Sequence, residues 1–143
     1  MRINIIHTFR AGKSSFIGIT WFIYTTFLTG SIPSELGKLN MNELVLARNH
    51  LNGTIPSELG LLSSLHELAL HENSLTGSLP SEFCQLMSLT HFSLHYNNLT
   101  GSLPSEMALL QSVRVLVLNQ NNIMSMFPSV ISQLKNLETL DLS

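Results

Sequence analysis

The stretch Leu65–Phe83 reads LHELALHENSLTGSLPSEF, and close variants of it return along most of the chain. All five prolines fall in one column of this repeat, spaced 23, 24, 24 and 24 residues apart, at Pro33, Pro56, Pro80, Pro104 and Pro128. Apolar residues also recur in fixed phase, in one copy at Leu75, Leu79, Phe83, Leu86, Leu89, Phe92 and Leu94. A fixed period of this length indicates a solenoid, in which copies of one structural unit stack side by side.

The spacing within one copy indicates a short strand followed by a turn. The LAL segment at 68–70 alternates apolar positions with a period of two, as a strand with one buried face does. Gly77 and Pro80 then turn the chain, because glycine adopts turn dihedrals and proline cannot donate to a β-ladder. One coil cannot bury its own leucines. We therefore expect the coils to stack around a continuous apolar column, with strands about 4.8 Å apart.

A column of asparagines follows the strands, 24 residues apart, at Asn49, Asn73, Asn97 and Asn121. We expect these side chains to turn inward at the bend, where an amide can hydrogen-bond to backbone groups. An inward amide without such partners would cost roughly 1–3 kcal/mol. The repeated asparagine therefore predicts a repeated hydrogen bond, which forms a structural ladder along the solenoid.

The repeat resembles the 24-residue plant-type leucine-rich repeat, LxxLxxLxLxxNxLTGxIPxxLGxL, which residues 65–83 match nearly letter for letter. The resemblance implies an α/β solenoid, a right-handed leucine-rich-repeat coil with one parallel β-sheet on the concave face and an irregular or 3-10 convex side. It covers five repeats, at 28–50, 51–74, 75–98, 99–122 and a truncated 123–143. The last copy stops before its asparagine, and we therefore interpret the chain as a fragment of a longer array. Dimerisation through that end is the alternative.

Residues 1–27 form an apolar N-terminal segment that allows two main interpretations. A basic region precedes an apolar run from 16 to 28, an order typical of a signal or anchor-like leader. Aligned backward from Leu28, however, Trp21 and Ile23 fall on the two strand leucines, which predicts a degenerate first repeat strand. A mispredicted upstream exon is a third source for this segment. Membrane attachment is possible through residues 1–27 or through a missing segment.

Charge and cysteine content exclude several classes of function. The net charge is −2 and 11% of the residues are charged, which leaves no basic footprint for nucleic acid. The single cysteine, Cys84, excludes an internal disulfide framework and a cysteine-based metal cluster. Its column holds only small residues, so we interpret Cys84 as a side chain packed against a neighbouring coil, with a reactive thiol as the alternative.

We predict no catalytic residues, no cofactor and no metal site, and hence no enzyme. A nucleophile needs an oriented base within about 3 Å, and no serine has a histidine placed so by spacing. His71 and His95 share one column in adjacent coils and should lie about 5 Å apart on the exposed sheet face, with His91 nearby. We weigh a metal or pH-sensitive site there. Zinc prefers further ligands, however, and no acid shares the histidine column, so a polar binding surface is favoured.

The outward residues between and after the strand leucines vary while the framework repeats, and in a stacked scaffold such positions carry specificity. We therefore predict a non-catalytic protein- or peptide-binding module of a cell-surface or secreted recognition protein. The alternative is a structural fragment of a longer receptor-like array without independent activity. The ligand is expected to contact the concave face at Arg48, Glu67, His71, Glu72, His91, His95, Tyr96, Asn119 and Gln120. Outward positions expected on the same face are Glu43, Val45, Ala47, Ala69, Ser93, Val115 and Val117.

Two acceptor sequons for N-glycosylation, NGT at 52–54 and NLT at 98–100, make Asn52 and Asn98 glycosylation candidates. Repeats with LTGxIP are similar to those of extracellular receptor ectodomains and secreted enzyme inhibitors. The resemblance therefore implies an extracellular or cell-surface, membrane-associated protein with a protein or peptide ligand.

Overall fold

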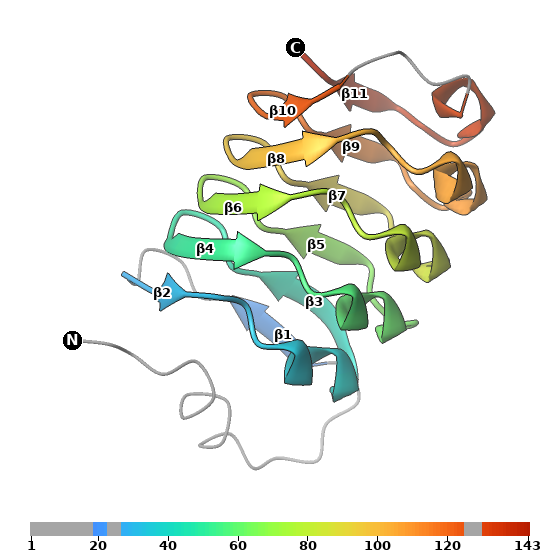
Figure 1. The fold of residues 1–143 in the computed structure, drawn as a ribbon. Coiled ribbons are helices and arrows are strands. Elements are labelled where there is room, and N and C mark those ends of the chain that lie inside the picture. The colour runs from blue at the N-terminus through green and yellow to red at the C-terminus, as the bar shows by residue number, and fades with distance from the viewer. Residues whose placement is uncertain (1–18, 23–26, 125–129) are drawn as a thin grey trace.

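The computed structural model describes residues 19–22, 27–124 and 130–143, and these form a solenoid of stacked coils (Figure 1). Successive coils contribute strands to two sheets, and neighbouring strands are parallel. One continuous apolar core draws side chains from both sheets and from the short helices that follow the second sheet. The expected solenoid of leucine-rich coils is therefore confirmed.

The first sheet has six strands in the order β1-β3-β5-β7-β9-β11. They are β1 (Ile19–Phe22), β3 (Met41–Val45), β5 (Glu67–Ala69), β7 (His91–Ser93), β9 (Val115–Val117) and β11 (Thr139–Asp141). Leu68 pairs with Phe92, which pairs with Leu116, and all three side chains are fully buried. The predicted apolar column thus runs through the centre of the stack.

A second sheet of five strands lies where the sequence predicts only turns, in the order β10-β8-β6-β4-β2. Its strands are β2 (Thr29–Gly30), β4 (His50–Thr54), β6 (Ser74–Gly77), β8 (Asn98–Gly101) and β10 (Asn122–Ile123). The leucine of each LTG run points into the core while its neighbours point outward. This alternation is that of an extended strand, and each segment pairs with the equivalent segment of the next coil. The predicted fold class holds, with two sheets instead of the single sheet expected.

Short 3-10 helices follow the second sheet, as the resemblance implies. They are η1 (Ser34–Lys38), η2 (Ser57–Leu61), η3 (Ser81–Gln85), η4 (Ser105–Leu109) and η5 (Ile131–Gln133). Coils approach closely here, since a Cβ added to Gly60 would lie 2.5 Å from the Glu82 carbonyl oxygen. Cys84, in the column of Gly60, is buried, and burial raises the pKa of its thiol to about 11. This supports the packed side chain over the reactive thiol.

The first strand precedes the five clear repeats. Trp21 of β1 pairs with Leu44 of β3, which is the register that the degenerate-strand interpretation predicts. Most of the remaining N-terminal segment, with Ile23 and the leader-like residues, lies outside the described residues. The domain division at residue 27 and membrane attachment through 1–27 therefore stay predictions. In the part of the chain that the structure describes, no helix is long and apolar enough to span a bilayer.

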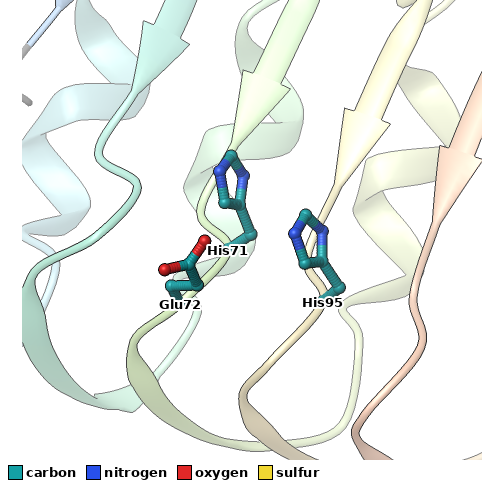
Figure 2. A group of neighbouring side chains, drawn as sticks. All are labelled: His71, Glu72 and His95. Atoms are coloured by element: carbon teal, nitrogen blue, oxygen red, sulfur yellow. The ribbon is translucent and has the colours of Figure 1, made fainter.

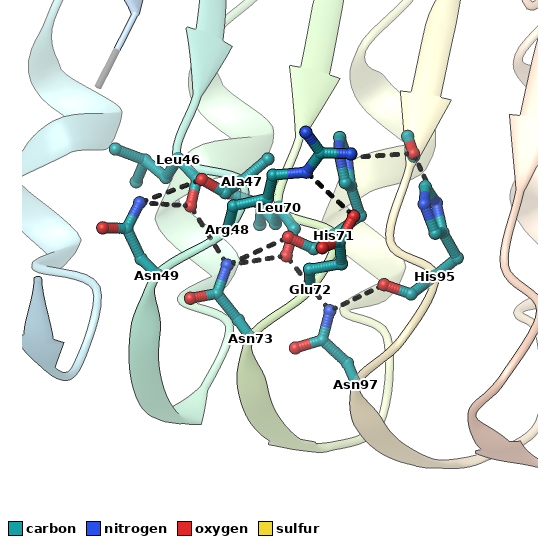
Figure 3. A network of polar contacts seen from close by, with 11 residues as sticks. Leu46, Ala47, Arg48, Asn49, Leu70, His71, Glu72, Asn73, His95 and Asn97 are labelled. Carbon is teal, nitrogen blue, oxygen red and sulfur yellow. Dashed lines mark hydrogen bonds and ion pairs between the residues drawn. The ribbon is translucent and has the colours of Figure 1, made fainter. Parts of the chain in front are cut away.

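Each asparagine of the predicted ladder joins two coils at the bend after the first sheet. Asn73 accepts a hydrogen bond at Oδ1 from the Leu51 N–H and donates from Nδ2 to the carbonyls of Leu46 and Leu70, all at 3.0 Å. The same three bonds, at 2.9 to 3.1 Å, recur at Asn97 and Asn121. Figure 3 shows three ladder amides in one row. The amides therefore tie the end of one strand to the preceding coil.

We predict that Asn97→Ala lowers the free energy of unfolding by about 1–3 kcal/mol, because the buried Leu75 N–H and the bend carbonyls lose their partner. Asn98→Ala is a matched control, because the Asn98 side chain is exposed and such surface changes stay within about 0.5 kcal/mol. Urea unfolding followed by circular dichroism measures both variants. An equal loss in the two variants would contradict the ladder as the source of stability.

Candidate functional site

The predicted ligand-contacting residues lie on β5 and β7 or at the bends after β3, β5, β7 and β9. We call this set the recognition face, and every member is at least partly exposed. Its members are Arg48, Glu67, His71, Glu72, His91, His95, Tyr96, Asn119 and Gln120. The structure brings most of them together around the bends, and it places Glu67 and His91 on the neighbouring strands β5 and β7.

One variable residue per coil occupies a left-handed bend directly before the ladder asparagine. The φ angles are 58° at Arg48, 55° at Glu72, 53° at Tyr96 and 55° at Gln120. This conformation is unfavourable for residues with a Cβ by roughly 1–2 kcal/mol, and it persists because the surroundings hold it. The Glu72 N–H, for example, donates to the His95 carbonyl at 2.9 Å. The bends therefore present four non-repeating side chains in a row.

Arg48 and Glu72 form an ion pair along this row. Arg48 Nε lies 3.0 Å from Glu72 Oε1, and the two side chains are 61% and 39% exposed. An exposed pair of this kind contributes only about 0–1 kcal/mol to stability. A charged group of a ligand can therefore replace one partner of this ion pair with little loss of folding stability.

His71 and His95 stack in adjacent coils, as their shared column predicts. Their ring centroids lie 4.4 Å apart and the planes differ by 8°. Ser93 Oγ lies between them, 3.3 Å from Nδ1 of His71 and 2.9 Å from Nδ1 of His95. One donor atom from each ring and one carboxylate oxygen of Glu72 all lie within 4.8 Å of one another (Figure 2). Sequence analysis considered acids only within the histidine column. It therefore did not predict Glu72 as a third possible metal ligand, which lies in the next column and comes close at the bend.

Both imidazoles of this pair have a lowered pKa. Burial is the main cause of the low pKa of His71, the charges of His95 and Arg48 lower it further, and Glu72 opposes them. Burial also lowers the pKa of His95, against Glu72 and Asp141 and with a smaller contribution from Arg48. Both rings are therefore mostly neutral at pH 7.

Tyr96 is the large aromatic side chain of the bend row. It is 54% exposed and meets His95 edge-on, with ring centroids 5.5 Å apart and planes at 67°. An open depression of about 510 Å³ lies beside it, bordered by Glu72, His50 and Ser74. Sequence reasoning missed His50 and Ser74, because both belong to the unexpected second sheet. The depression can receive a ligand side chain next to the tyrosine ring.

Asn119 continues the histidine column into the next coil. Its Oδ1 atom is buried and has no hydrogen-bond partner among the described residues. Buried polar atoms are normally paired, so such an atom requires an explanation.

Three residues expected on the exposed face are instead buried. Val45, Ala47 and Ala69 are 1%, 0% and 4% exposed and form a small apolar cluster separate from the main core. A ligand cannot contact them there. The other outward positions, Glu43, Ser93, Val115 and Val117, are partly exposed as expected.

A larger depression, of about 1400 Å³, lies away from the recognition face. It runs between the second sheet and the 3-10 helices, and residues of three coils, including Thr54, Pro56 and Glu58, border it. Its walls are the repeated framework, such as Ser34, Ser57, Pro33, Pro56 and Pro80. Similar chemistry in neighbouring coils gives a ligand little preference for one position along this depression.

The two glycosylation candidates lie on the second sheet. Asn52 is on β4 and Asn98 is on β8, and both side chains are exposed. Their neighbours Leu51 and Leu99 point into the core, so the asparagines face away from it. Asn52 pairs with Ser74, which borders the depression beside Tyr96, so a glycan on Asn52 would stand next to that depression.

Comparison with known proteins identifies the repeat. Residues 40–62, 64–86 and 88–110 each match the family model described as Leucine Rich Repeat. No curated protein matches the chain at the level of sequence.

Several solved structures share the fold. The PEPR1–AtPEP1 structure has a TM-score of 0.83 and 32% identity, over 87% of this chain and 18% of that one. The Arabidopsis receptor kinase HAESA, in complex with the peptide hormone IDA and the co-receptor SERK1, gives 0.78 and 36% over 81% and 20%. The LRR ectodomain of the receptor kinase SOBIR1 from Arabidopsis thaliana gives 0.80 and 29% over 88% and 69%. The chain thus spans about a fifth of the length of the first two.

We predict that acid destabilises the protein through His71 and His95. Their pKa values are lower in the folded state, so the unfolded chain takes up protons first as the pH falls through the unfolded value of 6.5. The contribution of the two neutral imidazoles to the free energy of unfolding is therefore fully present above pH 6.5 and is lost as the pH falls below it. Imidazole NMR titration in a buffer with chelator should give midpoints below 6.5 for both rings. The H71N/H95N double variant should lose less free energy of unfolding on acidification. Midpoints at or above 6.5 would contradict the prediction.

Proposed function

Because the chain is a leucine-rich-repeat protein, we propose that it is a non-catalytic module that binds an extended peptide or a protein segment through its recognition face. One observation carries the proposal. A scaffold that otherwise repeats presents four different side chains in a row, at Arg48, Glu72, Tyr96 and Gln120. Non-repeating positions on a repeating surface are where such a stack can distinguish one ligand from another.

The chemistry of the row suits a polar peptide with one apolar anchor. Tyr96 offers an exposed ring that His95 holds in place, and tyrosine and arginine are enriched at binding hot spots. Arg48 and Glu72 can pair with a carboxylate and a cationic group of the ligand. Four strands about 4.8 Å apart give a row of about 15 Å. This length suits a short extended segment rather than a complete interface of about 800 Å² per partner.

The structural neighbours support this class of partner. Their titles describe a receptor with a peptide hormone and a co-receptor and a plant peptide hormone receptor in complex with RGF2. The alternative is a segment of a longer array that binds nothing on its own. The chain covers only 18% and 20% of two of those receptor chains, which favours this alternative.

We further propose an extracellular location. The neighbours include receptor-kinase ectodomains, and both sequon asparagines are exposed on the second sheet.

The proposed binding is tested by panning a random-sequence peptide phage library on the immobilised chain. We expect a consensus peptide whose affinity falls roughly tenfold or more in Tyr96→Ala, since truncating a hot-spot side chain costs over about 1–2 kcal/mol. Leu109→Ala is the matched control, because Leu109 on η4 is 53% exposed against 54% for Tyr96 and lies outside the recognition face. Failure to enrich any consensus would favour the structural segment. Equal losses in the two variants would place binding elsewhere.

The proposed location is tested by expressing the full chain in a plant secretory host and mapping its glycans by mass spectrometry. We expect glycans on Asn52 and Asn98, because both are exposed in acceptor sequons. Asn52→Gln and Asn98→Gln should each remove one glycan. A chain retained inside the cell with both asparagines bare would contradict the proposal.

A further inference from the structure

We propose that His71, His95 and Glu72 form a binding site for a divalent transition metal such as Zn²⁺. The three residues bring two imidazoles and one carboxylate to one place at the bends after β5 and β7 (Figure 2). Imidazole and carboxylate are established zinc ligands, and three protein ligands with one open position are typical of zinc sites that keep a water. This inference goes beyond peptide binding and does not depend on it.

The separations of the donor atoms allow the site to close by side-chain rotation alone. All three donor atoms lie within 4.8 Å of one another. In a tetrahedral site with bonds of about 2.0–2.1 Å, two ligands lie roughly 3.3 Å apart. The two rings are stacked with their planes only 8° apart, so at least one imidazole must also turn out of the stack before both nitrogens point at one ion. The three side chains are only partly buried, which leaves room for that rotation.

The backbone that carries these ligands is held in place. The His71 carbonyl accepts from the Arg48 N–H at 3.0 Å, and the His95 carbonyl accepts from the Glu72 N–H at 2.9 Å. Asn73 follows Glu72 directly and is anchored at both ends of its amide. The metal therefore has to order side-chain torsions only, and a preorganised backbone favours binding.

Ser93 provides the outer contacts that such a site requires. Ligating histidines commonly donate their second ring N–H to an oxygen, which fixes the tautomer and the ring orientation. Ser93 Oγ lies within 3.3 Å of Nδ1 on both rings, and a hydroxyl oxygen has two acceptor lone pairs. A ring whose Nδ1 donates to Ser93 keeps its Nε2 as the metal ligand.

Charge at the site acts in both directions. The Glu72 carboxylate supplies negative charge beside the two imidazoles. Arg48 opposes binding, because it holds Glu72 Oε1 at 3.0 Å and adds a positive charge. Removing the guanidinium should therefore strengthen metal binding, an effect that no purely structural role of Arg48 produces.

Titration of the chelator-treated full chain with ZnCl₂ by isothermal calorimetry tests the proposal. We expect one zinc per chain, and at least about a tenfold loss of affinity in His95→Ala and in Glu72→Gln. Arg48→Gln should bind more tightly than wild type. His66→Ala is the control, because it removes an exposed histidine outside the cluster and should leave the affinity unchanged. Circular dichroism shows whether each variant folds. If His95→Ala fails to fold, the affinity of Glu72→Gln decides the test.

A second readout assigns the ligands directly. Zinc should shift the imidazole NMR signals of His71 and His95 and leave the other histidines in place. Equal shifts across the exposed histidines, or wild-type affinity in Glu72→Gln, would overturn the three-ligand site.

Discussion

The asparagine amide that closes each bend is the interaction on which the rest of the structure depends. Its Nδ2 binds the strand-end carbonyls of its own coil and of the coil before, and its Oδ1 binds the N–H at the start of the second sheet. One side chain thereby fixes the spacing of two coils and satisfies backbone groups that a buried bend would otherwise leave unpaired. The left-handed residue that precedes it, such as Glu72, is held in an unfavourable conformation by this bonding.

The fixed spacing of the coils brings residues that are one repeat apart in the sequence into contact. Residues 24 positions apart become neighbours on adjacent coils, so that Arg48 meets Glu72 and Arg114 meets Glu138. His71 and His95 stack for the same reason. The chemistry of the surface therefore arises from columns that cross the coils, while residues adjacent in sequence often face opposite sides of a sheet. Exchanging one column residue changes one local contact and leaves the ladder beneath it intact.

Period and phase were enough to predict the strands of the first sheet, the buried Leu68–Phe92–Leu116 column and the stacked histidines, because these follow from stacking alone. The second sheet was missed, because Thr76 and Gly77 have turn propensity and become paired only when coils lie in register. Glu72 was predicted as a ligand-contacting residue, but its grouping with both histidines was missed, because the acid was sought only within the histidine column. The burial of Val45 and Ala47 depends on a second cluster outside the repeat pattern.

The repeat also determines which surfaces can be specific. Along the 3-10 side, Glu35, Glu58, Glu82 and Glu106 recur in the first turn of successive helices, so a ligand bound there gains nearly the same energy after a shift of one coil. Specificity is a difference between such alternatives, and a translationally uniform surface supplies almost none. On the recognition face the corresponding row changes from arginine to glutamate, tyrosine and glutamine. A ligand that shifts by one coil there would lose its charge partners and its aromatic contact together. The proposed ligand would therefore have one favoured register, although the hollow beside Tyr96 is the smaller of the two.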